Sequence, residues 1–302
     1  MTENTSTITA NGKIIRVTAN VQTREQLAKA AENGAEAIGL LDLRGFFDTV
    51  QDLPGEEEQY DIYGEIGRIM GDSPVTVVIS NWVGHRCPAN TDLIKNQLRA
   101  LLRANIHGNF SILLPRVSHV SEIIKVQQLI RESQAELEGG NLPFRVPGEM
   151  GVMADVPAVL AAMDIFCFES KFFIAGEDSL YYLYAADPEI KTSNSILNYF
   201  DSAYLSYLQD LVAKAHRRHK RAAVSSPMVD EPAAILLLLG MGYDEIIVAP
   251  GKIAATRELV SRLDAHAAKL IASKAISYWE PEKSFAYCRD CLVRAVKKPQ
   301  TD

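Results

Sequence analysis

Short apolar segments alternate with helical patterns along most of this chain, and this alternation constrains its fold more than any other feature. Residues 231–248, for example, predict a helix, a glycine turn and then a buried strand. Eight strand-and-helix repeats within about 250 residues are typical of the α/β fold called the (β/α)8 or TIM barrel. The predicted strands are Ile14–Val21, Ala37–Leu43, Val75–Asn81, Phe110–Val117, Gly148–Val156, Phe172–Gly176, Ala222–Ser226 and Glu245–Ala249.

Composition limits the classes of function that the chain can have. It has 302 residues, of which 47% are hydrophobic, and a net charge of −7. The absence of a long basic run disfavours binding to nucleic acid or to an anionic membrane. The N-terminus lacks the apolar core of a secretory signal, and the longest apolar run, 233–241, is too short to span a bilayer. Four cysteines in a chain of this length do not suggest a disulfide framework, so we expect a reduced, cytoplasmic protein.

No low-complexity linker divides the chain. We expect a flexible N-terminal segment over residues 1–13, the barrel over 14–271, and a helical extension over 272–302 that packs against the barrel. The extension carries Cys288 and Cys291 at CxxC spacing. One such pair supplies only half of a zinc site, so two incidental cysteines are the preferred interpretation and their role stays open.

Polar side chains follow most of the predicted strands. In a TIM barrel the C-terminal ends of the strands carry the functional site, so these residues predict a polar ligand pocket. The alternative is that they are ordinary polar loop residues, and the sequence alone does not decide which of them point inward. The candidates for substrate binding at these strand ends are Asp42, Arg44, Asn81, Arg116, Glu177, Ser225 and Ser226, and Asp155 and Asp178 are further acidic residues there.

Five ordered motifs occur along the chain: ENGAEAIGLL at 32–41, LPGEEEQ at 53–59, QLRALLRA at 97–104, GVMADVPA at 151–158 and the segment at 231–248. Together they resemble the C-terminal barrel of the phosphoenolpyruvate-utilising enzymes, the family of enzyme I of the sugar phosphotransferase system, pyruvate phosphate dikinase and phosphoenolpyruvate synthase. The resemblance implies the barrel superfamily that binds phosphoenolpyruvate and pyruvate, and a homodimer as in enzyme I. It does not by itself transfer the activity.

The positions that the resemblance assigns to substrate-binding arginines are altered. The family binds the trianion phosphoenolpyruvate with several arginines, which offer charge and bidentate donors. These positions fall on Asp42, on Val78, in a shortened loop near 87–96, and on Pro188, while Arg86 stands where the family has Lys. Each lost charge-assisted contact removes about 1.5–3 kcal/mol of binding free energy.

The catalytic and metal positions implied by the resemblance are altered too. The catalytic Cys position falls on Val224, which cannot donate a proton, so we expect no catalytic residue of the family to remain there. The family holds Mg²⁺ with one Glu and one Asp. The Glu position falls on Asp155, and the Asp position falls on Ser179 in the ungapped register, which we prefer, or on Asp178 after a shift of one residue.

Two hypotheses follow from these substitutions. The first is a degenerate barrel without phosphoenolpyruvate phosphotransfer activity, which acts as a binding or regulatory protein and has a possible protein partner. The alternative is a Mg²⁺-dependent enzyme, in which Asp155, Asp178 and Glu177 hold the metal and Arg44 or Arg116 binds the carboxylate of a small oxo-acid. Unaltered phosphotransfer is the least favoured. Because the barrel begins within the first twenty residues, it would need a histidine donor on another protein.

Overall fold

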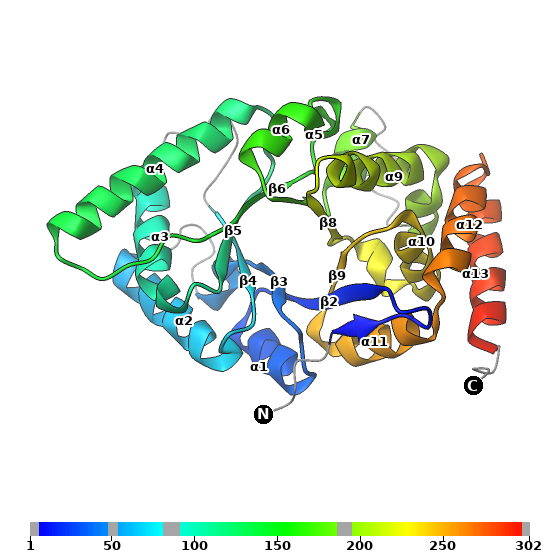
Figure 1. Cartoon of the computed structure of the whole chain (residues 1–302), viewed down its shortest axis with the longest axis horizontal. Helices are drawn as coiled ribbons and strands as arrows, with labels where there is room; N and C mark the ends of the chain where they lie inside the picture. Colours follow the sequence, from blue (N-terminus) through cyan, green and yellow to red (C-terminus); the bar gives the residue numbers. More distant parts are fainter. Residues whose placement is uncertain (1–5, 48–53, 81–90, 186–194, 298–302) are drawn as a thin grey trace.

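The chain folds into a closed barrel of parallel strands surrounded by helices, which confirms the predicted fold class. The computed structural model describes residues 6–47, 54–80, 91–185 and 195–297. Eight parallel strands follow one another in chain order, and β2 also pairs with β9, which closes the sheet (Figure 1). They are β2 (Ile14–Val21), β3 (Ile38–Leu41), β4 (Val75–Val78), β5 (Phe110–Leu114), β6 (Met150–Met153), β7 (Phe172–Ala175), β8 (Arg221–Val224) and β9 (Glu245–Val248).

Helices follow the strands and form the outer ring of the barrel (Figure 1). No helix in the described ranges is long and apolar enough to cross a membrane. The α-helices are α1 (Arg24–Glu32), α2 (Glu56–Met70), α3 (Thr91–Ala104), α4 (Val120–Gly139), α5 (Pro157–Ala161), α6 (Met163–Glu169), α7 (Ser179–Leu183), α9 (Ser202–Arg217), α10 (Pro232–Met241), α11 (Ile253–Arg262), α12 (Ala265–Ile276) and α13 (Pro281–Lys297). Short 3₁₀ helices are η1 (Leu43–Phe46), η3 (Asn105–His107), η4 (Ile196–Phe200), η5 (Pro227–Asp230) and η6 (Pro250–Lys252).

Both ends of the chain add structure to the barrel. A ninth strand, β1 (Thr7–Ile8), pairs antiparallel with β2 and lies inside the segment that the sequence analysis set apart as flexible. At the other end, α12 packs closely against α10. A Cβ on Gly240 would lie 2.1 Å from the carbonyl oxygen of Ala268, so this contact requires glycine.

Most of the observed strands are shorter than predicted, because their polar C-terminal residues belong to loops. The sequence extends the fifth predicted strand to Val156 and the seventh to Ser226, whereas the corresponding strands β6 and β8 end at Met153 and Val224. Those loop residues bend away from the ladder at the rim of the barrel, where a strand pattern no longer constrains them.

Strand β2 shows how alternation divides the barrel into an outer core and an interior. Ile15, Val17, Ala19 and Val21 are fully buried in the large apolar cluster between the sheet and the helices. The intervening residues face the barrel interior, as expected for a strand whose side chains alternate between two faces. From the N-terminal to the C-terminal end of the barrel, these inward residues are Arg16, Thr18, Asn20 and, just after the strand, Gln22.

A small apolar cluster fills the middle of the interior and separates the two ends of the barrel. Below it, the Thr18 hydroxyl donates a 2.8 Å hydrogen bond to Glu245, and Arg16 lies 3.2 Å from the same carboxylate. Gly39 lies against Thr18 and Glu245. The cluster consists of Leu40, Val78, Leu113, Phe172, Ile174, Ala223 and Ile247, with Met153 packed against it.

We predict that Gly39→Ala destabilises the barrel by about 1–3 kcal/mol, because the added Cβ overpacks its interior. That Cβ would lie 2.2 Å from the Thr18 hydroxyl oxygen and 2.7 Å from Glu245 Oε1. Gly64→Ala is the matched control, since nothing lies within 4 Å of its Cβ position on α2. Urea unfolding measures both variants. An unfolding free energy for Gly39→Ala equal to that of the wild type would contradict this packing.

Candidate functional site

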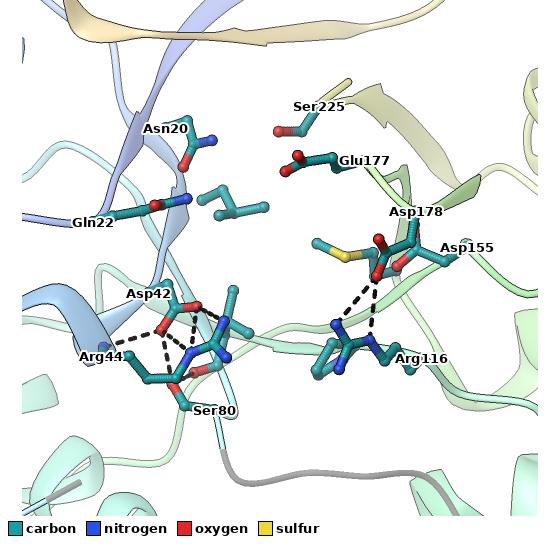
Figure 2. A pocket seen from close by; sticks show the side chains of 14 residues that line it. Asn20, Gln22, Asp42, Arg44, Ser80, Arg116, Asp155, Glu177, Asp178 and Ser225 are labelled. Carbon is teal, nitrogen blue, oxygen red and sulfur yellow. Dashed lines mark hydrogen bonds and ion pairs between the residues drawn. The ribbon is translucent and has the colours of Figure 1, made fainter. Parts of the chain in front are cut away.

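A cavity of about 250 Å³ opens at the C-terminal ends of the strands, the end of a TIM barrel that carries function (Figure 2). Seven of the predicted site residues line it: Asp42, Arg44, Arg116, Asp155, Glu177, Asp178 and Ser225. The other lining residues are Asn20, Gln22, Leu40, Val78, Ser80, Pro115 and Met153.

One described candidate, Ser226, does not line this cavity. Ser226 lies in a neighbouring hollow, where its hydroxyl caps η5 by accepting from the Met228 N–H. Asn81 and Arg86 lie outside the described residues.

The cavity is also lined by Asn20, Gln22 and Ser80, which were not among the predicted site residues. The signal for Asn20 and Gln22 was available, because they continue the inward-facing positions of β2 beyond Thr18.

Arg44 is held by Asp42 on the same turn. The Arg44 Nε donates hydrogen bonds of 3.1 and 3.0 Å to the two carboxylate oxygens of Asp42. The same carboxylate caps η1 by accepting from the Arg44 backbone N–H, and it accepts a 3.2 Å hydrogen bond from Ser80. Asp42 is buried, and its hydrogen bond raises the pKa of the guanidinium. The pair therefore leaves the positive charge of Arg44 largely neutralised.

Arg116 is held in the same way by a carboxylate on the opposite side. Its Nε and one terminal nitrogen lie 3.3 and 3.2 Å from Asp178 Oδ2 (Figure 2). Arg116 adopts a φ of 53°, a left-handed conformation that is unfavourable for a residue with a side chain. Backbone strain of this kind clusters at functional sites. Both side chains of this pair are partly exposed, so solvent screens their attraction.

Asp155 is the most perturbed group in the cavity. It is only 2% exposed, and its Oδ1 has no hydrogen-bond partner in the described part of the chain. Burial, and secondly the charge of Asp178, raise the pKa of Asp155 to about 7, while Arg116 opposes the shift. A Cβ on Gly176 would lie 2.2 Å from this oxygen, so the glycine leaves room for the carboxylate.

Two residues that the metal and catalytic hypotheses named turn away from the cavity. The Ser179 hydroxyl is fully buried, donates to the Gly176 carbonyl at 2.7 Å and lies 2.9 Å from the Tyr204 hydroxyl. Asp178, not Ser179, therefore presents the carboxylate to the cavity. Val224 packs in the outer core, and Ser225 is the residue after β8 that lines the site.

The carboxylates fit a magnesium ion only in part. Mg²⁺ prefers carboxylate oxygens and is often held by one or two of them together with waters, which suits Asp155 and Asp178. However, no group of three His, Cys, Asp or Glu side chains in the described ranges could hold a metal. Asp178 is also engaged by Arg116. A hydrated Mg²⁺ on these two residues therefore requires Arg116 to move away.

Comparison with known proteins decides the family. A family model described as the PEP-binding domain of PEP-utilising enzymes matches residues 1–87 and 82–265. The chain belongs to the PEP-utilising enzyme family. It is 30% identical over 296 residues to the phosphoenolpyruvate-protein phosphotransferase of Lactococcus lactis subsp. lactis (strain IL1403), a match that covers 90% of this chain and 52% of that protein.

Other relatives are consistent with this assignment. The chain is 30% identical over 288 residues to multiphosphoryl transfer protein 1 of Escherichia coli (strain K12), which covers 88% of this chain and 35% of that protein. It thus spans about half the length, or less, of these two relatives. A citrate lyase crystal structure from Burkholderia xenovorans LB400 shares the fold, with a TM-score of 0.60 and 14% identity over 99% of this chain and 98% of that one.

We predict that Asp155→Asn stabilises the protein at alkaline pH by about 2 kcal/mol, because the buried carboxylate no longer has to ionise. The folded pKa near 7 lies above the ordinary value of 3.8 for an aspartate, so the wild type loses stability as the pH rises from about 4 to about 7. The advantage of the variant should therefore vanish near pH 4. Urea unfolding at several pH values measures it.

Asp61→Asn, at an exposed position on α2, is the control for this prediction, and its effect on stability should be small. Equal stability of Asp155→Asn and the wild type across the whole pH range would show that Asp155 carries no burial penalty.

Proposed function

We propose that this chain is a ligand-binding barrel of the PEP-utilising family that does not transfer the phosphoryl group of phosphoenolpyruvate. One observation carries the proposal: Asp42 and Asp178, two carboxylates of the cavity itself, hold both arginines that line it. A trianion entering this site would have to displace them and would then face their negative charges. The cavity is thus poorly matched to phosphoenolpyruvate.

The chemistry of the strand ends supports the same proposal. Val78, at one arginine position implied by the family resemblance, belongs to the small apolar cluster in the middle of the barrel interior. After β8 the cavity is lined by Ser225, and a serine hydroxyl is a poor proton donor near neutral pH. Among the described residues the cavity therefore offers no guanidinium group without a carboxylate partner, and the residue after β8 is not an effective acid for the enolate carbon.

A Mg²⁺-dependent enzyme acting on a small oxo-acid is the second candidate. The unpartnered Oδ1 of Asp155, with Asp178 near it, favours this alternative. If Arg116 released Asp178, a single movement would free one carboxylate for the metal and one guanidinium for the carboxylate of the oxo-acid. When bound, the metal would polarise the substrate oxygen as a Lewis acid.

Thermal unfolding with Mg²⁺ alone, phosphoenolpyruvate alone and both together tests the proposal. A ligand at 100 times its Kd adds about 2.7 kcal/mol of stability, which shifts the melting temperature measurably. We predict no shift in any arm, and no release of pyruvate when an acceptor protein with a phosphorylatable histidine is added to take the phosphoryl group. The Lactococcus lactis phosphotransferase is the positive control.

A shift that requires both Mg²⁺ and phosphoenolpyruvate, with release of pyruvate, would overturn the proposal. Replacing phosphoenolpyruvate by pyruvate tests the second candidate. That candidate predicts a shift that needs both Mg²⁺ and the oxo-acid and that disappears in Asp155→Ala.

A further inference from the structure

Asp42 and Asp178 pair with the two arginines of the cavity, and other hydrogen-bond acceptors in the cavity have no donor. Asp155 Oδ1 and Asn20 Oδ1 are both buried atoms without a hydrogen-bond partner in the described structure. Leaving such an acceptor unsatisfied costs free energy, so a donor from a bound molecule would be favourable there. Two orphaned acceptors in one cavity indicate a ligand that donates at least two hydrogen bonds.

The unbalanced charge of the cavity is negative. Its described lining contains four carboxylates, Asp42, Asp155, Glu177 and Asp178, against two guanidinium groups, Arg44 and Arg116. Since Asp42 and Asp178 hold the arginines, Asp155 and Glu177 remain without a cationic partner among the ion pairs of the described chain. A ligand that balances the charge of the cavity would therefore be a cation.

The acceptors come from three strand ends and surround one space. Asn20 lies on β2, Asp155 follows β6, and Glu177 lies in the turn between β7 and α7. Figure 2 shows Asn20 facing Glu177 and Ser225 across the cavity, with Asp155 beside Asp178. A donor group placed between these strand ends could reach acceptors on more than one side.

We infer that this cavity binds a small organic cation with several N–H donors, an ammonium or guanidinium compound. This inference rests on the proposed function, because it requires that the site no longer takes phosphoenolpyruvate. N–H donors would satisfy the acceptors of Asp155 and Asn20, and the positive charge would compensate Glu177. The apolar part of the lining, Leu40, Val78, Pro115 and Met153, would contact the carbon chain of such a ligand.

An organic cation suits the described site better than a metal ion does. No three carboxylate, histidine or cysteine groups in the described ranges converge on one point. An ammonium or guanidinium compound does not require such convergence, since its N–H groups point in several directions and can each meet a separate acceptor. It also leaves the Arg116–Asp178 pair in place.

The test is isothermal titration calorimetry of the full chain with agmatine and with putrescine at fixed ionic strength. Sodium pyruvate and tetramethylammonium chloride are the ligand controls, since one is an anion and the other a cation without N–H donors. We expect saturable binding of at least one of the two amines and none of the controls. Glu177→Gln and Asp155→Asn should each raise the Kd about tenfold or more.

Glu138→Gln, on the exposed face of α4, makes the same change of charge away from the cavity and should leave the Kd unchanged. Glu177 is exposed, so its variant is expected to fold, and Asp155→Asn is expected to be more stable than the wild type. Weaker binding in these variants therefore cannot come from misfolding.

Failure of both amines to bind, or binding that neither cavity variant weakens, would overturn the inference while the proposed function stands. Pyruvate release from phosphoenolpyruvate would overturn both.

Discussion

The parallel ladder between β2 and β9 is the constraint on which the rest of the structure depends. It pairs Arg16 with Glu245 and Thr18 with Ile247, and thereby joins the first barrel strand to the last. Closure gathers the C-terminal ends of all eight strands at one rim, so residues far apart in the sequence line one cavity. Closure also fixes which alternate residues of β2 face inward. The inward residues nearest the C-terminal end, Asn20 and Gln22, line the cavity.

Within this scaffold, the character of the cavity depends on how its charges are paired. Arg44 and Arg116 could have bound an anion, but each lies against a carboxylate of the same cavity. Asp42 is central to this pairing, because its buried carboxylate accepts hydrogen bonds from the Arg44 guanidinium. Membership of the family therefore does not by itself assign the chemistry of this site, because function depends on a few residues on a stable scaffold.

Much of the fold could be predicted from the sequence, because strands buried on both faces give continuous apolar runs and the helices between them give a 3.6-residue period. The ends of the strands could not be predicted from the sequence. Polar residues such as Asp155 and Ser226 fit the sequence pattern of a strand, although β6 and β8 have already ended before them. Strand β1 was missed because two residues carry no period.

The site was predicted at the level of its residues but not of their partners. Position at strand ends identified Asp42, Arg44, Arg116, Asp155 and Asp178. The pairing of Arg116 with Asp178 spans 62 residues and depends on barrel closure, so no local pattern could reveal it. The orientation of Ser179 away from the cavity depends on Tyr204, which lies on another helix.

We propose that carboxylates of the cavity itself hold its arginines and so prevent phosphoenolpyruvate from binding. The most direct test compares calorimetric binding of phosphoenolpyruvate, with Mg²⁺ present, to the wild type and to the double variant Asp42→Asn/Asp178→Asn. We expect no binding to the wild type and measurable binding to the double variant, because both guanidinium groups are released. Binding to the wild type, or no gain in a folded double variant, would contradict it.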